Sequence, residues 1–275
     1  KKNPQCDVPF AVNSNLGQKK ELLDALIEST HSFKDFSLYT SCEATGLQAE
    51  YIRYGLEWEN WLHNMYRVNE EANVKSVNVM MTINGLCLFS ITEFMDEMLD
   101  LREEYGRRAP TMTLNILRFP SFQAAAILPE DIKTFYKEKL DNWYNSERPQ
   151  KMLSDAEKES VRRLVDYLDI VKTPHKNTAE TPKLYNDFKS FFAQYDIRRK
   201  KDFMSTFPGP LAEWFNSLEA EVPSSHQILH GVNSVNTINQ IIDDPATIKE
   251  YDGGDDEHEK DSQPGWNTKT DELGG

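Results

Sequence analysis

The stretch from Thr40 to Leu56 holds the residues of this chain whose types and spacing could bind a small polar ligand. It begins with small hydroxyl groups, including Ser41, continues through Glu43 and a glycine, and ends with a helix that carries Arg53. Such hydroxyls and an arginine could hold the carboxylate and ribose of a ligand, because the planar guanidinium meets a carboxylate through two hydrogen bonds. In the alternative interpretation, Ser41 and Glu43 only cap the next helix, and Arg53 pairs with a neighbouring glutamate.

Elsewhere the sequence shows no self-contained enzyme signature. It contains no G-x-x-x-x-G-K-[ST], no G-x-G-x-x-G after a strand, no H-E-x-x-H and no C-x-x-C. The histidines are scattered, and only His226 and His230 have an i,i+4 spacing that could hold a metal on one helix face. The basic run 198–201 indicates a solvated helix face, with a phosphate or carboxylate site as the alternative.

The elements that must position these residues alternate between strands and helices over positions 1–148. Apolar periodicity predicts strands at 8–16, 36–40, 77–83 and 111–117, with helices at 18–32, 47–56, 57–71, from 90 onward and at 130–146. This order is typical of βαβ crossovers and a parallel sheet. Ligands bind such sheets at the C-terminal ends of their strands. Ser90 and Glu93 also predict a capping box.

The pattern changes after Pro149. Residues 149–218 are helical and rich in aromatic side chains, with Ser154 as a predicted helix cap, and we expect them to pack on the α/β part. Residues 219–275 are polar and acidic, and positions 243–275 contain eleven acidic residues but only three lysines. Low hydrophobicity with high net charge predicts a disordered tail, with a short helix at 232–242 as an open alternative.

The net charge of −14 argues against a nucleic-acid partner and against docking on an anionic membrane. No apolar run reaches the length of a membrane-spanning helix, and no signal peptide is evident at the start of the chain. The three cysteines, Cys6, Cys42 and Cys87, are too few and too widely spaced for a disulfide framework. These features favour a cytoplasmic protein.

Several motifs resemble those of one enzyme family. The first strand ends in S-N-L (14–16), the second in S-C-E (41–43), and the next helix begins G-L-Q-A-E-Y-I-R (46–53). The third strand ends T-I-N (82–84), and the fourth leads into L-R-F-P (117–120). From about 9 to 218 the chain resembles the later half of radical S-adenosylmethionine (SAM) enzymes, especially the twitch-domain-containing group of phages and marine bacteria. The 48–53 segment is the most specific part of this resemblance.

The resemblance implies a fold, cofactors and site residues. It implies an α/β fold consisting of strands three to six of a partial parallel (β/α) barrel, followed by the helical extension and the acidic tail. Family members use SAM and a [4Fe-4S] cluster to generate a 5′-deoxyadenosyl radical. The C-x-x-x-C-x-x-C and G-G-E motifs of that chemistry are absent from this chain, so the cluster ligands would lie upstream. Ser41 and Arg53 would contact the methionyl and ribose groups of SAM, and Asn84 is a weaker candidate.

The resemblance assigns no catalytic residue and no metal ligand to this chain. It leaves the substrate open, as either a small molecule or a peptide. Two other interpretations stay open: a non-catalytic α/β binding protein without the cluster half, and an interaction protein that uses the helical region and the tail. The expected domains are 1–148, 149–218 and 219–275.

Overall fold

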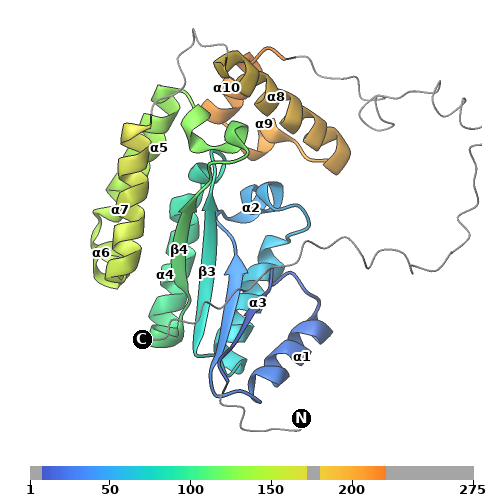
Figure 1. Cartoon of the computed structure of the whole chain (residues 1–275), viewed down its shortest axis with the longest axis vertical. Coiled ribbons are helices and arrows are strands. Elements are labelled where there is room, and N and C mark those ends of the chain that lie inside the picture. The colour runs from blue at the N-terminus through green and yellow to red at the C-terminus, as the bar shows by residue number, and fades with distance from the viewer. Residues whose placement is uncertain (1–7, 172–179, 221–275) are drawn as a thin grey trace, which may run out of the picture. The chain divides into compact units, whose positions relative to one another are not determined.

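The computed structural model describes residues 8–171 and 180–220. Within these ranges, one parallel sheet contains β1 (Phe10–Asn13), β2 (Phe36–Ser41), β3 (Ser76–Ile83) and β4 (Thr111–Ile116), hydrogen-bonded in that order. The predicted βαβ order and parallel sheet are therefore confirmed. All four strands run toward the same edge, and Figure 1 shows this C-terminal edge facing α2, α8 and α9.

Ten α-helices accompany the sheet in the described residues. Those between the strands are α1 (Lys20–Thr30), α2 (Gly46–Ile52), α3 (Trp58–Glu71) and α4 (Ile91–Tyr105). After β4 come α5 (Glu130–Tyr144), α6 (Glu147–Met152), α7 (Asp155–Ile170), α8 (Glu180–Arg199), α9 (Phe203–Thr206) and α10 (Pro210–Ser217). Within the described part of the chain, no helix is both long and apolar enough to cross a bilayer.

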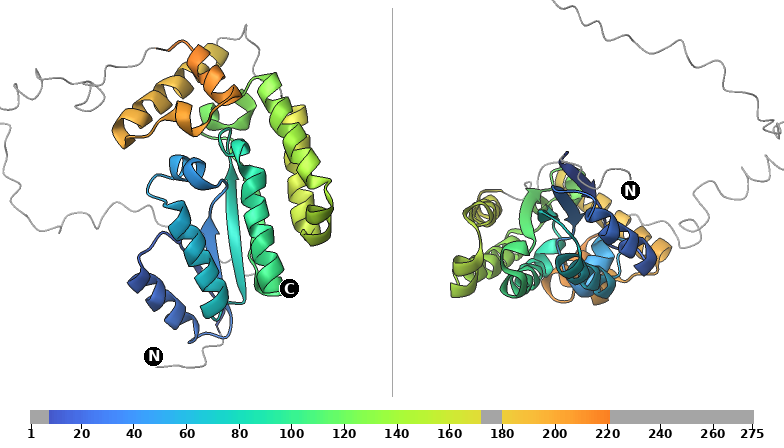
Figure 2. Two further views of the ribbon diagram at one scale, coloured as in Figure 1. Left: turned by 180° about the vertical axis from the view of Figure 1, so that it is seen from behind. Right: turned by 90° about the horizontal axis from the view of Figure 1, so that it is seen from below.

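The two faces of the sheet differ in chemistry. Val77, Val79 and Met81 of β3 are buried on one face, while Met80 and Thr82 are exposed on the other. Figure 2 shows α1, α3 and α4 together on one side of the sheet. Parallel sheets are usually covered on both faces, so a polar, solvent-exposed face is unusual. The helices between the strands therefore leave this face of the sheet open.

A buried ion pair binds the N-terminal end of β4. Glu157 in α7 is 3% exposed, and each of its carboxylate oxygens accepts a hydrogen bond from Arg102, at 2.7 and 2.8 Å. The same carboxylate accepts from the backbone nitrogen of Met112 at 2.9 Å and from the nitrogen and hydroxyl of Ser154. Ser154 and Glu157 form a capping box, which confirms the predicted cap at Ser154.

The capping box predicted at Ser90 and Glu93 is wrong. The Ser90 side chain caps nothing in α4 and instead accepts a hydrogen bond from the backbone nitrogen of Thr45, at 3.2 Å. The Glu93 carboxylate binds Lys139 of α5 at 2.6 Å. Both side chains are used for tertiary contacts, because α2 and α5 bring a donor within reach of each.

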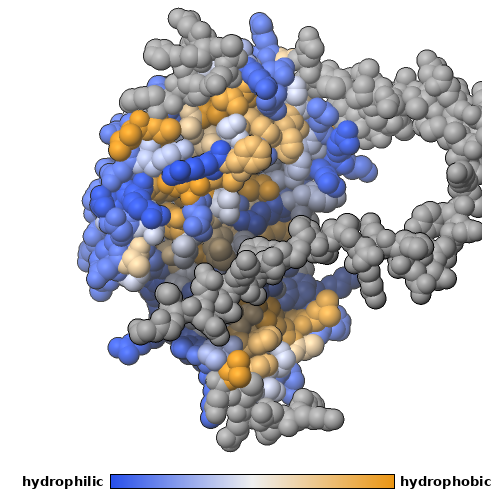
Figure 3. Space-filling view, in the orientation of Figure 1, coloured by the Kyte–Doolittle hydropathy of each residue, from blue (hydrophilic) through white to orange (hydrophobic). Residues whose placement is uncertain are grey.

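The helices after residue 180 pack on the α/β part, as expected. Tyr51 of α2 lies against the rings of Phe203 and Phe207, and its hydroxyl donates to Asp196 at 2.7 Å. Gln48 donates to the carbonyl of Thr206 at 2.6 Å. Figure 3 shows apolar surface around α8 and the segment after β4, with a second apolar area in the lower part of the view, whereas the surface over α6 and α7 is mostly hydrophilic. The aromatic helices therefore cover the C-terminal edge.

Several sequence predictions fall outside the described residues. They are the disordered tail beyond position 220, the alternative helix at 232–242 and the His226–His230 pair.

Candidate functional site

The C-terminal ends of β2 and β3 bring a charged pair to the rim of the sheet. Glu43 follows β2 and is 2% exposed, and Arg53 is 28% exposed. Nε and Nη2 of Arg53 donate to the same oxygen, Oε2 of Glu43, at 3.1 and 2.5 Å. The backbone nitrogen of Thr82, near the end of β3, also donates to Oε2, at 3.4 Å. The pair thus ties the ends of two neighbouring strands together.

Arg53 reaches Glu43 because α2 is shorter than its sequence suggests. The predicted helix over 47–56 ends at Ile52, and Arg53 has φ −117° and ψ 83°, outside the helical region. Gly55, at φ +88°, occupies the left-handed region that only glycine adopts readily. The chain therefore turns immediately after α2, and the guanidinium points back to the strand end. Neither the predicted partner on a neighbouring turn nor a capping role for Glu43 is observed.

The two oxygens of the Glu43 carboxylate are in different situations. Oε2 accepts three hydrogen bonds, whereas Oε1 accepts none from the described residues. Burial raises the pKa of this carboxyl above its ordinary value, and the nearby Arg53 guanidinium opposes that rise. Oε1 is not among the fully buried acceptors that lack a partner in the described residues, so water can reach it. Oε1 is therefore an acceptor that a ligand hydroxyl or amine could satisfy.

Asn84 has a local structural role at the end of β3. Its Oδ1 accepts hydrogen bonds from the backbone nitrogens of Leu86 and Cys87, at 2.9 and 3.1 Å. Its Nδ2 donates to the carbonyl of Thr82 at 3.2 Å. These bonds fix the loop that leads to the short 3₁₀ helix η1 (Cys87–Phe89) and leave Asn84 9% exposed.

Ser41 lies at the last position of β2 and is half-buried, on the polar face of the sheet. Its hydroxyl makes no hydrogen bond with the described residues. Arg53 and Asn84 are linked through Glu43 and the two peptide groups around Thr82. The structure thus connects Arg53 with Asn84 and leaves Ser41 outside this network.

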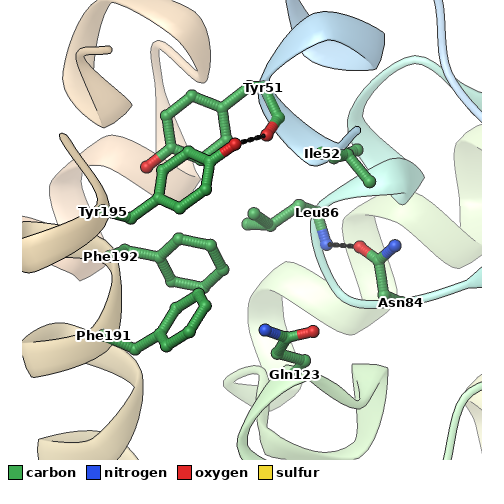
Figure 4. Close-up of a pocket in the computed structure, with 8 residues that line it drawn as sticks. All are labelled: Tyr51, Ile52, Asn84, Leu86, Gln123, Phe191, Phe192 and Tyr195. Atoms are coloured by element: carbon green, nitrogen blue, oxygen red, sulfur yellow. Dashed lines mark hydrogen bonds between the residues drawn. The ribbon is translucent and has the colours of Figure 1, made fainter. Parts of the chain in front are cut away.

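A small cavity of about 90 Å³ opens beside Asn84, between α2, α8 and the segment after β4. Figure 4 shows aromatic rings from α8 facing Leu86, Asn84 and Gln123 across this space. The Tyr195 hydroxyl donates to the carbonyl of Tyr51 at 2.7 Å, which fixes one wall. Ser41 and Arg53 do not line the cavity.

Sequence reasoning missed two contributors to this rim. Glu43 was assigned only a capping role or a place in a motif, although an acid beside a strand end and ten residues before an arginine is a usable signal for a pair. Gln123 lies three residues after the L-R-F-P segment (117–120) and could be found only once the loop after β4 is placed.

The described cysteines do not fit an iron–sulfur cluster. Cys42 and Cys87 are fully buried, and burial raises the pKa of the Cys42 thiol to about 12 and that of Cys87 well above its ordinary value. Each thiol lies within hydrogen-bonding distance of a backbone carbonyl. Cluster ligands are thiolates, and no group of three or more potential metal ligands occurs among the described residues.

Comparisons of the chain with protein-family models, with curated protein sequences and with solved structures found no match.

Proposed function

We propose that this chain is the part of a radical SAM enzyme that binds and orients SAM at the C-terminal edge of its sheet. The observation that carries this proposal is the Glu43–Arg53 pair, which is held at the ends of β2 and β3 with one carboxylate oxygen open. Parallel sheets place their ligand sites at this edge. The motifs that carry the resemblance lie in the same region: 41–43 at the end of β2, 46–53 in α2 and at its end, and 82–84 at the end of β3.

The chemical groups of SAM match the rim. A methionyl carboxylate would pair with the exposed part of the Arg53 guanidinium, which is pre-oriented by Glu43. A ribose hydroxyl would donate to Oε1 of Glu43 and satisfy its open acceptor. Ser41, with an unengaged hydroxyl at the end of β2, would add a further hydrogen bond. In this proposal, Asn84 shapes the loop rather than holding the ligand, because its side-chain amide is already engaged.

The exposed polar face of the sheet supports a partial barrel. In a closed barrel, that face would border the lumen, where polar residues face the ligand. The proposed fold is therefore the second half of a (β/α) barrel, completed by strands outside the described residues. With a reduced [4Fe-4S] cluster, bound SAM supplies a 5′-deoxyadenosyl radical to such enzymes. Because the described cysteines do not fit a cluster, the proposal assigns to this chain the binding of SAM and the exclusion of water only.

SAM affinity tests this proposal. We expect Arg53→Gln to weaken SAM binding to the full chain by one to two decades, because a charge-assisted hydrogen bond is worth about 1.5–3 kcal/mol. Titration calorimetry measures the change. Arg162→Gln is the matched control, because Arg162 is half-exposed and pairs only within α7.

Arg53→Lys, which keeps the charge, checks that a loss of affinity is not a loss of folding, and thermal melting of each variant completes that check. Equal SAM affinity in folded wild-type and Arg53→Gln chains, or no SAM binding to either, would overturn the proposal.

A non-catalytic binding protein is the second candidate. It is favoured by the burial of both described cysteines, because buried thiols are inert structural groups rather than reactive ones. The gene sequence upstream of the Lys1 codon separates the two candidates. A continuous open frame that encodes C-x-x-x-C-x-x-C and G-G-E supports the enzyme, whereas a stop codon followed by a start codon supports the binding protein.

A further inference from the structure

A second hollow, of about 310 Å³, lies along α8 beside the rim cavity. In the described residues it is lined by Phe191, Gln194, Tyr195, Arg198 and Arg199. Phe191 and Tyr195 also line the rim cavity, so the two hollows meet at these rings. Figure 4 shows both rings on the α8 side of the rim cavity. We call the combined hollow the α8 groove. Its volume falls at the lower end of the range for small-molecule sites.

The aromatic part of the α8 groove is rigid and accessible. Phe191 is 39% exposed, although its ring also packs against Phe122 with a centroid distance of 5.2 Å. The rings of Phe191 and Tyr195 lie 22° from parallel, with centroids 6.2 Å apart. Because the Tyr195 hydroxyl is bonded to the Tyr51 carbonyl, its ring is fixed. An exposed, pre-oriented pair of rings is suited to stacking with a flat unsaturated ligand.

The other end of the α8 groove is cationic. The Arg199 guanidinium lies over the Tyr54 ring, 4.0 Å from its centroid, which orients it while leaving it exposed. Arg198 is exposed and makes no hydrogen bond or ion pair with the described residues. Basic residues at a helix C-terminus are favoured by the helix dipole. However, that preference does not explain why they border a hollow with aromatic walls.

The nearby acids accept hydrogen bonds from groups other than these arginines. Asp196 accepts hydrogen bonds from the Tyr51 hydroxyl and from the backbone nitrogen of Phe203, at 2.7 and 2.9 Å. Asp202 caps α9 through the backbone nitrogen of Met204, at 3.0 Å. Both carboxylates are engaged away from the arginines. In a chain with net charge −14, two exposed arginines without an ion pair in the described residues border one ligand-sized hollow.

We infer that the α8 groove binds a small anionic ligand that carries a flat ring, with its carboxylate or phosphate on Arg198 and Arg199 and its ring against Phe191 and Tyr195. Arginine recognises either anion bidentately. The groove lies next to the rim where SAM is proposed to bind. Binding of this ligand to the groove does not require SAM. The further step, that this ligand is the substrate of the enzyme, rests on the proposed function.

The test uses three probes of similar size: phenyl phosphate, phenylacetate and uncharged 2-phenylethanol. Each is titrated into the isotope-labelled full chain, and backbone amide shifts are followed by nuclear magnetic resonance. We expect at least one anionic probe to shift the amides of residues 191–199 and to bind at least about tenfold more tightly than 2-phenylethanol, which corresponds to about 1.4 kcal/mol. Which anion binds identifies the phosphate or the carboxylate as the preferred group.

Variants assign the binding to the groove. Arg198→Gln combined with Arg199→Gln should remove the preference for the anion, and Phe191→Ala should weaken all three probes. Lys183→Gln, an exposed position near the start of α8, is the matched control. Equal binding of all three probes, or an anion preference that survives the double substitution, would overturn the inference.

The same variants titrated with SAM keep the two proposals distinguishable. The arginine double variant should bind SAM as the wild-type chain does. If the chain fails to bind SAM but binds an anionic probe in the groove, the proposed function is wrong and the inference about the groove is confirmed.

Discussion

The two edges of the sheet each hold a buried carboxylate paired with an arginine, and the two pairs are satisfied differently. At the N-terminal edge, both oxygens of Glu157 accept hydrogen bonds, from Arg102, Met112 and Ser154. At the C-terminal edge, the hydrogen bonds that Glu43 accepts from the described residues all reach one of its oxygens. The first pair is saturated by the fold, and the second leaves an acceptor for something else. This difference distinguishes a structural pair from a candidate binding pair.

The pKa values of the two carboxyl groups are shifted in opposite directions, in line with their different hydrogen bonding. Burial acts to raise the pKa of Glu157, but hydrogen bonds from Arg102, Ser154 and Met112 outweigh it and hold the pKa below its ordinary value. For Glu43, burial prevails over Arg53, and the pKa is raised. The fold therefore stabilises the charged form of one carboxylate and penalises the charged form of the other.

The largest expected effect is at the saturated pair. Arg102→Gln leaves the Glu157 carboxylate buried without its main partner, and breaking a buried pair in this way costs about 3–5 kcal/mol. We expect the free energy of unfolding to fall by that amount in urea denaturation. Arg148→Gln is the control, because Arg148 is 34% exposed among three surface acids and should cost about 1 kcal/mol or less. Equal losses for the two variants would contradict the structural role of Glu157.

A smaller loss is expected at the open pair. Arg53→Gln removes a partner that is itself partly exposed, and the raised pKa of Glu43 lets this carboxyl take up a proton instead. The expected decrease in unfolding free energy is about 1–3 kcal/mol, the cost of one unsatisfied buried acceptor. The same urea denaturation measures it. A loss as large as that of Arg102→Gln would show that both pairs are structural.

The smallest expected effect is on the pH dependence of the free energy of unfolding, where the two carboxylates should act with opposite sign. A lowered folded-state pKa gives Glu157 a stabilising contribution above the ordinary value of about 4.3, which is lost as the pH falls through the folded-state pKa. The raised pKa of Glu43 has the opposite sign, so its contribution declines as the pH rises from that ordinary value through the folded-state pKa.

Unfolding free energies of Glu157→Gln and Glu43→Gln, measured across this pH range against the wild-type chain, test the contrast. The deficit of the Glu157 variant should grow as the pH rises, and that of the Glu43 variant should shrink. Parallel trends would refute the assignment.

Local sequence patterns predicted the sheet and missed the partners at its rim. The apolar runs of the strands and the apolar spacing of the helices depend on near neighbours, and both are visible in sequence. The end of α2 depends on the turn at Gly55, and the partner of Ser90 lies 45 residues away at Thr45. Arg53 was placed in the candidate site by its motif. Its partner, Glu43, becomes clear once the end of α2 at Ile52 turns the arginine back toward the strand end.

Two backbone amides report on whether SAM binds at the Glu43 carboxylate and not at the Glu157 carboxylate. The nitrogen of Thr82 donates to Glu43, and the nitrogen of Met112 donates to Glu157, so each amide reports on one carboxylate. Both resonances are followed while SAM is titrated into the labelled full chain. We expect the Thr82 amide to shift in a saturable manner and the Met112 amide to stay in place. A stationary Thr82 amide, or equal shifts of both amides at saturation, would contradict this expectation.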